Sequence, residues 1–456
     1  MIGLDVNRLP TGWTLSPLDA VSEVVISNVD KKEYDDQQRV KLCNYTDVYY
    51  RDKILDRDDY MPATASQEQI NRFTVQSGDV AITKDSETAD DIGRPSYAPN
   101  NIPGLIYGYH LAIYRPFDKR VGRFMHYIFE SLPIRAELQV RTPGVTRVGL
   151  SMDTLRNLRV PLPTPELAAR IADYLDHETA EIDAAISDQI ALIELLEERQ
   201  QVQKYRLATG QTLATSRGAE VVRFWGELPL DWSLQKLQWH FDIGNGSTPS
   251  TSTARFWDQD GFPWLNSSVV NHPSVVHPSR RVSHTALEEL HLPIVPPGSL
   301  LMGITGQGKT RGMVTTLDIE ATINQHLAYL VPRSPQSPIS VEYLRLALDV
   351  AYPELRQLSD GNGGTRGALT CYMLQQFRVP VPPKNLQDAL VTEARRETAR
   401  TVQAVADAES FIALARERRA ALITAAVTGQ IDVTARNKPA AEQLEDDIAQ
   451  GLHREN

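Results

Sequence analysis

The stretch "IADYLDHETAEIDAAI", residues 171–186, decides the fold of this chain. It lies in a segment that runs on from Pro165 to about Leu207 without another Gly or Pro. Apolar or small residues recur in it at heptad positions a and d, beginning at Ala172 and Leu175, which is typical of a helix that pairs with another helix. Thr164 is a suitable N-cap, and Pro165 suits the first helical position because its missing N–H costs nothing there. The segment predicts a helix about 60 Å long.

The same heptad register returns in the segment that follows Pro383, near the end of the chain. The first segment is acidic, with 4 basic and 10 acidic residues over 165–211, whereas the second carries arginine clusters around Arg395 and Arg418. An apolar seam of this length cannot stay in water, so we expect the two helices to pair with each other, antiparallel. The predicted helix-pairing residues are Leu175, Ile182, Ile186, Ile193, Leu196, Val391, Val405, Ile412 and Leu422.

The whole chain is built from two copies of one plan. "LPTGWTLSPL" from Leu9 matches "LPLDWSLQKL" from Leu228 at a shift of 219 in the numbering, and the same shift superposes "RVPLP" on "RVPVP" and the first "TGQ" on the second. "HLAIYRP" from His110 resembles "HLAYLVP" from His326 at a shift of 216. Because this period is far longer than a solenoid repeat, it indicates a duplicated pair of domains.

Each copy joins a variable block to a helical block. Short β-branched and aromatic runs among Gly, Pro and Asn turns predict mixed strands and helices in the variable blocks. We therefore predict an α+β fold with two mixed α/β domains, two long antiparallel coiled-coil helices and a pseudo-twofold internal duplication. The predicted boundaries are 1–164 for the first head, 165–211 for the central helix, 212–383 for the second head, 384–433 for the C-terminal helix and 434–456 for an acidic flexible tail.

Composition excludes several classes of protein. The start of the chain lacks a secretory pattern and no stretch approaches the roughly 20 apolar residues that span a bilayer, so we expect a cytoplasmic protein with no membrane partner. Cys43 and Cys371 have no companion at metal-ligand spacing, which predicts buried thiols. The net charge of −11 does not exclude DNA as a partner, because most of the net negative charge lies outside the two heads.

The stretch "LLMGITGQGKTRG", residues 300–312, contains the pattern of a phosphate-binding loop from Gly303 to Thr310. Such a loop must open directly into a helix. The following "RGMVTTLDIEATI" favours a strand instead, and the first copy has no counterpart of this loop. We interpret the stretch as a Gly-rich turn and keep a P-loop NTPase that uses Gly303–Thr310 as an alternative.

Other catalytic patterns are missing from the sequence. Methyl transfer to a base calls for an Asn/Asp-Pro-Pro-aromatic loop, which the chain lacks. We interpret the carboxylate-rich "YRDKILDRDDYMP", residues 50–62, as a solvated loop, and the histidines of the second head show no ligand spacing: His272, His277, His284 and His291. We therefore expect no catalytic residue and no metal site.

Several of these segments together resemble one known family, the specificity subunits of type I restriction-modification systems. They are "LPTGW" and "LPLDW" at the head of each half, "GDVAITKDSETADDIG", "TRVGLSMDTLRNLRVPLPTP", "IADYLDHETAEIDAAI", "LIELLEERQ" and "RRAALITAAVTGQIDV". The resemblance covers nearly the whole chain, and it implies two target-recognition domains that each read one half of a bipartite site in double-stranded DNA. It also implies that two antiparallel helices fix the separation of these domains.

The same resemblance implies that the subunit itself is not an enzyme and binds no cofactor. Methyltransferase subunits, expected to number two, dock on it, and restriction/translocase subunits join them. S-adenosylmethionine, ATP and Mg are expected only in those partners, which would carry out adenine methylation and DNA cleavage. A coiled-coil adaptor that binds protein but no DNA remains a further alternative.

Candidate DNA-binding residues follow from base chemistry, because Arg and Lys suit guanine while Asn and Gln suit adenine. The candidates are Lys84, Arg94, Thr146 and Arg147 in the first head, and Gly306, Gln307, Lys309, Arg311, Thr365 and Arg366 in the second. The two Thr-Arg pairs recur in both copies. Their alternative role is to hold the fold or to contact phosphates of any sequence.

Overall fold

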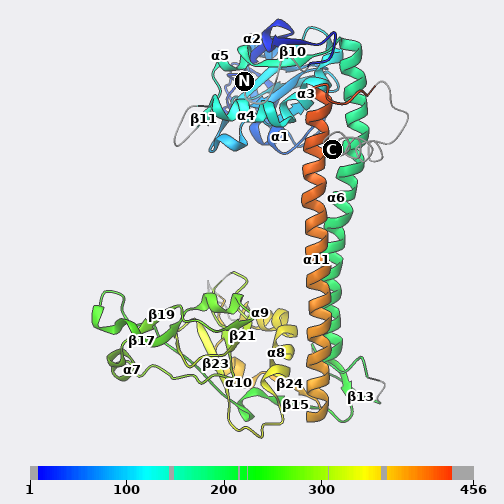
Figure 1. Ribbon diagram of the computed structural model, residues 1–456. Helices are drawn as coiled ribbons and strands as arrows, with labels where there is room; N and C mark the ends of the chain where they lie inside the picture. The colour runs from blue at the N-terminus through cyan, green and yellow to red at the C-terminus, as the bar shows by residue number, and fades with distance from the viewer. Residues whose placement is uncertain are drawn as a thin grey trace, which may run out of the picture. The chain divides into compact units, whose positions relative to one another are not determined.

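The structure is a computed structural model that describes residues 9–142, 148–213, 216–222, 224–306, 308–360 and 367–433. The chain forms two compact units, the first of residues 1–190 and 409–456 and the second of residues 191–408. Each unit holds a mixed α/β head and parts of two long helices, α6 (Pro165–Ala208) and α11 (Lys384–Val427) (Figure 1). The predicted fold class, with mixed heads and two long helices, is thus confirmed.

Two sheets form the first head. One has the antiparallel order β2 (Ser22–Ile26), β10 (Leu111–Pro116), β6 (Val80–Thr83), β8 (Pro95–Tyr97), and the other has the order β4 (Met61–Ala65), β3 (Gln38–Cys43), β9 (Ile102–Tyr107), β5 (Thr74–Val75). Successive side chains of a strand point to opposite faces. In β6, Val80 and Ile82 therefore enter one core, while Ala81 enters the core between the sheets. The central sheet is buried on both faces.

Helices and two short strand pairs complete the first head. Its helices are α1 (Tyr45–Tyr49), α2 (Gln67–Phe73), α3 (Gly122–Glu130), α4 (Leu132–Val140) and α5 (Met152–Asn157). The short pairs are β1 (Thr14–Pro17) with β12 (Arg159–Leu162), and β7 (Asp85–Ser86) with β11 (Val148–Gly149). Phe124, Tyr127 and Ile128 of α3 pack on the central sheet in the same core as Leu175 of α6.

The second head repeats this plan with a five-stranded sheet. Its order is β16 (Phe241–Asn245), β23 (Leu327–Pro332), β20 (Ser299–Gly303), β21 (Val314–Leu317), β18 (Ser274–Val275). A second sheet has the order β19 (Arg280–Val282), β17 (Trp257–Leu265), β22 (Thr322–Ile323), and two pairs join β13 (Arg217–Val222) to β14 (Gly226–Pro229) and β15 (Ser233–Lys236) to β24 (Arg378–Val381). The helices are α7 (His284–Glu289), α8 (Val341–Val350), α9 (Tyr352–Asp360) and α10 (Cys371–Gln376).

The duplication is visible element by element. Elements whose first residues are related by the repeat shift of 219 include β1 and β15, β2 and β16, β6 and β20, α3 and α8, α5 and α10, and α6 and α11. Registers are kept as well: β1 pairs Thr14 with Leu162, and β15 pairs Ser233 with Val381. In both heads a tryptophan meets an aromatic ring edge-on, Trp13 with Phe124 and Trp232 with Tyr343. The matched sequence anchors are therefore matched packing positions.

The long helices pair inside each unit. In the first unit Leu175 of α6 shares a core with Leu422 and Ile423 near the end of α11. In the second unit Leu207, near the end of α6, shares a core with Leu390 and Val391 near the start of α11. The start of each helix thus meets the end of the other, so the pairing is antiparallel. All nine residues predicted to line the seam are buried or half-buried.

Each long helix ends on a glycine that contacts a head. Gly429 has φ +71°, and the N–H of Gln430 donates to the Ala425 carbonyl at 2.8 Å, which is the bonding of a Schellman cap. A Cβ at Gly429 would lie 2.4 Å from Cγ of Pro10 and 3.4 Å from the ring of Trp13. Gly210 meets Pro229 and Trp232 in the same way. In each unit the glycine of "TGQ" therefore packs against the Pro and Trp of a Leu-Pro…Trp segment. We refer to this contact as the glycine joint.

Gly429→Ala is expected to destabilise the first unit. The left-handed conformation costs an alanine about 1–2 kcal/mol, and the clash with Pro10 adds to that cost. Gly12→Ala is the matched control, because Gly12 has φ +86° but no neighbour within 4 Å of its Cβ position. Urea unfolding should show the larger loss for Gly429→Ala. Equal losses in the two variants would mean that the joint adds nothing.

A hydrogen-bonded carboxylate holds α6 to the first head. Oδ1 of Asp176 accepts from Nε of Arg123 at 2.8 Å and from the Tyr127 hydroxyl at 2.6 Å. Burial alone would raise the pKa of Asp176, but the hydrogen bonds from Arg123 and Tyr127 outweigh it and the pKa is lowered. The ionised form is therefore the one that stabilises the fold.

Asp176→Asn is expected to lower the free energy of unfolding at pH 7 by about 1 kcal/mol, after allowance for solvent screening. Because the folded pKa lies below the ordinary value of 3.8, this contribution is fully present above pH 3.8 and is lost as the pH falls from there through the folded pKa. Urea unfolding from pH 7 down into the acid range should show a constant gap between the two proteins at first, and then a gap that narrows below pH 3.8. Asp173→Asn, an exposed change on the same helix, should match wild type throughout, and a gap for Asp176→Asn that does not narrow in the acid range would contradict the assignment.

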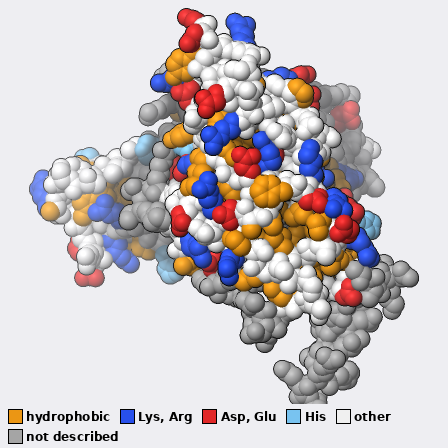
Figure 2. All heavy atoms as spheres, turned by 90° about the horizontal axis from the view of Figure 1, so that it is seen from above, with side chains coloured by type: hydrophobic (Ala, Val, Ile, Leu, Met, Phe, Trp, Pro, Cys, Tyr) orange, Lys and Arg blue, Asp and Glu red, His pale blue; other side chains and the backbone are white. Residues whose placement is uncertain are grey.

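Within the described residues, none of the helices is both long and apolar enough to cross a membrane. Figure 2 shows one face of the molecule, on which Lys and Arg side chains alternate with Asp and Glu side chains and with apolar groups. Such a face differs from the continuous basic surface that phosphate binding favours. The candidate DNA-binding residues therefore have to be judged by their own surroundings.

Candidate nucleic-acid interface

A cleft of about 440 Å³ in the first head is lined by aromatic rings, carboxylates and one histidine. The rings come from α1 and its end: Tyr45 stacks on Tyr49 with centroids 5.5 Å apart, and Tyr50 meets Tyr49 edge-on at 4.7 Å. The exposed fraction of Tyr50 is 75%. Exposed, rigid aromatic surface of this kind is suited to stacking against a base or a sugar.

An ion pair lies beside this cleft, between Arg94 and the lining residue Asp91. The Tyr49 hydroxyl donates to Oδ2 of Asp91 at 2.6 Å, and Nη2 of Arg94 lies 3.3 Å from Oδ1 of the same carboxylate. The hydrogen bond to Asp91, together with burial, raises the pKa of Tyr49 to about 12, so the phenol keeps its proton. Asp91 thus holds the ring and the guanidinium in fixed positions at the cleft.

A second carboxylate that lines the cleft, Asp85, contacts a lysine and a histidine. Its Oδ2 lies 2.6 Å from Nζ of Lys84 and 2.6 Å from Nδ1 of His110. Burial would raise the pKa of Asp85, but the bonds from Lys84 and His110 outweigh burial and lower it. His110 has φ +79°, a conformation that non-glycine residues seldom adopt and that is often found at functional sites.

Two of the four candidates of the first head, Lys84 and Arg94, lie beside this cleft. Lys84 and Arg94 both pair with carboxylates that line it. Thr146 and Arg147 lie outside the described residues, but Val148, which follows them, lines the cleft and pairs with Ser86 in the strands β11 and β7. The fold therefore brings Lys84 and Arg94 to the same cleft, and each of them is already paired with a carboxylate.

In the second head, the Gly-rich stretch is a tight connection between β20 and β21. The Tyr352 hydroxyl donates to the Lys309 carbonyl at 2.8 Å, and Nη1 of Arg356 donates to the Gly308 carbonyl at 2.6 Å. The side chain of Arg311 is 3% exposed and forms an ion pair with Asp360 at 2.5 Å. Arg311 therefore holds the connection in place, a role that the sequence did not reveal.

Other candidates of the second head remain accessible or lie outside the described residues. Gly306, with φ +105°, and Lys309 are exposed at the tip of the connection. Gln307, Thr365 and Arg366 lie outside the described residues. Residues near them in the sequence are in contact, because Thr305 forms a β-bridge with Ala368.

This connection lacks the context of a phosphate-binding loop. The N–H of Gly312 donates to the Gly303 carbonyl at 2.7 Å, which closes the turn, and β21 follows at Val314. Residues 311–313 form no helix whose N-terminus faces the loop. The nucleotide-binding alternative therefore has no structural support.

Sequence reasoning missed two histidines at equivalent places in the heads. His110 bonds to Asp85 on β7. Nδ1 of His326 lies 2.7 Å from Oγ1 of Thr305, which is the counterpart of Ser86 at the repeat shift of 219. The repeated "HLA" at His110 and His326 was the signal that could have identified them. The duplication thus places a histidine beside the candidate DNA-binding residues of each head.

Among the described residues, one group of three side chains has the spacing of metal ligands. Ligand atoms of Asp52, His126 and Glu130 lie within 4.8 Å of one another. Nη1 of Arg419 lies 3.1 Å from Oε2 of Glu130, so a guanidinium already supplies positive charge there. Burial lowers the pKa of His126 well below its usual value, which keeps it neutral. That the chain uses no metal stays a prediction.

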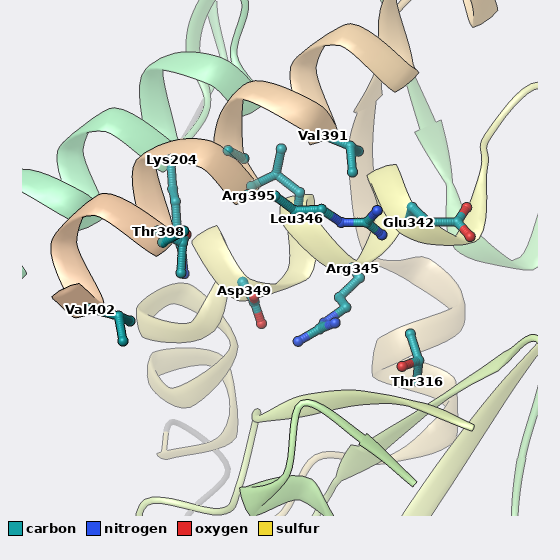
Figure 3. A pocket seen from close by; sticks show the side chains of 12 residues that line it. Lys204, Thr316, Glu342, Arg345, Leu346, Asp349, Val391, Arg395, Thr398 and Val402 are labelled. Atoms are coloured by element: carbon teal, nitrogen blue, oxygen red, sulfur yellow. The ribbon is translucent and has the colours of Figure 1, made fainter. Parts of the chain in front are cut away.

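A second hollow, of about 320 Å³, lies in the second unit beside α8 and the long helices (Figure 3). Val402 and Arg395 of α11, Lys204 of α6, and Arg345 and Asp349 of α8 line it. Burial raises the pKa of Asp349, while Lys204 and Arg345 act against it. Apolar groups and charges of both signs alternate here, which suits contact with another protein better than contact with phosphates.

Comparison with known proteins finds related sequences over part of the chain. Residues 229–392 match the family model of the type I restriction modification DNA specificity domain. The chain is 26% identical over 171 residues to the type I restriction enzyme MjaIX specificity subunit of Methanocaldococcus jannaschii, and 22% identical over 244 residues to the EcoR124I/EcoR124II specificity subunit of Escherichia coli. These matches cover 37% and 51% of this chain but only 38% and 54% of the relatives' lengths.

Solved structures extend the likeness to the whole fold. A chain from a type I R-M system superposes with a TM-score of 0.67 at 18% identity, covering 93% of this chain and all of that one. The HsdS subunit from Thermoanaerobacter tengcongensis gives a TM-score of 0.54, also at 18% identity, over 93% of this chain and 98% of its own. The second head and the start of α11 thus match the type I specificity domain in sequence, and the chain shares the fold of these solved structures along most of its length.

Proposed function

We propose that this chain is the non-catalytic subunit that gives a type I restriction-modification complex its DNA specificity, and that each head reads one half of a bipartite site. The observation that carries the proposal is the equivalence of the two candidate sites. In the first head β7 pairs with β11 beside His110, and in the second head Thr305 forms a bridge with Ala368 beside His326. The two pairings lie at matching positions of the repeat. Two related sites with different side chains are suited to two different half-sites.

The long helices are the part that sets the spacing of the half-sites. Each is a continuous helix of 44 residues, about 66 Å long at 1.5 Å per residue. A paired helix of that length is stiff, and both ends of the pair are built into heads through the glycine joints. The DNA spacer that the complex accepts should therefore be fixed by helix length, as half-site spacing is fixed in dimeric DNA-binding proteins.

The same helices offer surface for methyltransferase subunits. Their exposed large apolar residues are Ile190, Leu192, Leu195 and Val202 on α6, and Val402, Phe411 and Leu414 on α11. Contiguous exposed apolar patches mark protein contacts, and we propose that these side chains form such patches along the helices. In this proposal two methyltransferase subunits dock here, restriction subunits join them, and S-adenosylmethionine, ATP and Mg act in those partners in the cytoplasm.

Sequencing of methylated bases in cells that carry this chain and its methyltransferase subunit tests the proposal. It should reveal one motif made of two specific parts separated by a fixed number of unspecified bases. A motif in one part, or no dependence on this chain, would contradict it. A protein adaptor without DNA contact is the remaining alternative, and a gel shift of the assembled complex on DNA separates the two.

A further inference from the structure

The cleft of the first head has a hydrogen-bonding character that selects its ligand. Three carboxylates line it, those of Asp85, Glu87 and Asp91. Ionised carboxylates only accept hydrogen bonds, and they repel phosphate oxygens, which also only accept. Among the described residues, Lys84 and Arg94 lie beside the cleft, and each is already paired with one of these carboxylates. The DNA group that fits the cleft is therefore a hydrogen-bond donor and not a phosphate.

His110 has a defined tautomer in this setting. Its Nδ1 lies 2.6 Å from Oδ2 of Asp85. Because Lys84 and His110 keep the pKa of Asp85 low despite burial, that carboxylate has no proton to donate. The proton of the contact must then sit on Nδ1 of the imidazole. In the neutral ring, the form that reading a donor with this ring requires, Nε2 has no proton and is an acceptor.

The donors that double-stranded DNA presents in its major groove are few. They are the exocyclic amino groups, N4 of cytosine and N6 of adenine. We propose that His110, oriented by Asp85, accepts a hydrogen bond at Nε2 from the exocyclic amino group of one cytosine or adenine in the half-site read by the first head. This inference rests on the proposed function and names the base chemistry of one of its two sites.

The second head provides a contrast at the equivalent histidine. Nδ1 of His326 faces the Thr305 hydroxyl, which can donate or accept, and Nε2 lies 3.3 Å from the amide nitrogen of Gln325. The amide oxygen of Gln325 in turn accepts from the Thr248 hydroxyl at 2.6 Å. Because Gln325 already occupies Nε2 of His326, the two heads should not read the same group with the equivalent ring.

The test uses the complex of the full chain with its methyltransferase subunit and the bipartite site found by methylation sequencing. Duplexes are made in which each adenine of the site is replaced by purine, or each cytosine by 2-pyrimidinone, which removes only the amino group. Wild type should lose roughly tenfold or more in affinity at one position of one half-site, as expected for loss of a specific base contact. His110→Asn should bind the unmodified site more weakly and show no further loss at that position.

Asn is the chosen replacement because it tolerates the positive φ of His110 better than most residues. Thermal unfolding should confirm that each variant is folded. His326→Ala is the matched control, and it should leave the sensitive position of wild type unchanged.

Asp85→Asn adds a readout that a purely structural role would not change. The amide can donate to Nδ1, which moves the imidazole proton to Nε2 and turns that atom into a donor. This variant should therefore prefer a carbonyl-bearing base, guanine or thymine, at the same position. The inference is wrong if His110→Asn weakens binding equally on every duplex, including unrelated DNA, or if no amino position couples to it. A wild type without any bipartite preference would instead refute the proposed function.

Discussion

A chain in which residues 10–164 replace residues 229–383 is expected to direct methylation to a site with two identical half-sites in inverted orientation. The reason is structural equivalence: the two segments are related by the repeat shift at both ends, and the β1–β12 and β15–β24 pairs have the same register. Each segment ends at the start of a long helix, at Pro165 or Lys384. Under the proposed function, two copies of one head should read the duplex in opposite directions.

Methylation sequencing of cells that carry this chain with its methyltransferase subunit measures the result. The reciprocal chain, with residues 229–383 placed at 10–164, is the control and should give a palindrome of the other half-site. Together the two palindromes should contain the two halves of the wild-type motif. An unchanged wild-type motif from either chain would show that the heads do not act as independent readers.

Leu175→Ala is expected to lower the free energy of unfolding of the first unit by about 2–5 kcal/mol, the range for deleting a buried leucine side chain. Leu175 is 0% exposed in a core that also contains Leu422, Ile423 and Phe124, so the cavity would lie where α6, α11 and the head meet. Leu195→Ala, on the same helix at 60% exposure, is the matched control and should change stability little. Urea unfolding of both variants measures the difference.

Equal stability of the Leu175 and Leu195 variants would contradict the packing described for the seam. Unfolding that is confined to the first unit is also informative, because the second unit has its own core around Leu207 and Leu390. Two unfolding transitions in the Leu175 variant, with the later one at the wild-type position, would show that the units hold the helix pair separately.

The long helices could be predicted because their signals are local. The heptad register and the Pro at the start of α6 follow from neighbouring residues, and the helix starts at Pro165 as the sequence indicates. The duplication could be found because its anchors are packing residues that both copies keep, such as Trp13 and Trp232. The sheets could not be predicted in detail. Strand β3 pairs in parallel with β9, with five other strands and two α-helices between them in the chain, and no local pattern specifies such a partner.

The candidate site was predicted only in part, for a related physical reason. Base chemistry singles out cations such as Lys84 and Arg94, and both lie at the cleft. It does not show which cations are already paired. Arg311 and Lys309 therefore looked the same in the sequence, although Arg311 is buried and Lys309 is exposed. His110 was missed because its role depends on Asp85, which lies 25 positions away in the sequence and which only the fold brings into contact with it.

The most direct test of the central claim, that two heads held by paired helices read two half-sites at a set distance, is methylation measured against spacer length. Duplexes keep both half-sites and differ by single base pairs between them, each adding about 3.4 Å and roughly a tenth of a turn. We predict one spacer length that is methylated efficiently, with steep loss when one base pair is added or removed. Equal methylation across a range of spacer lengths would contradict the claim.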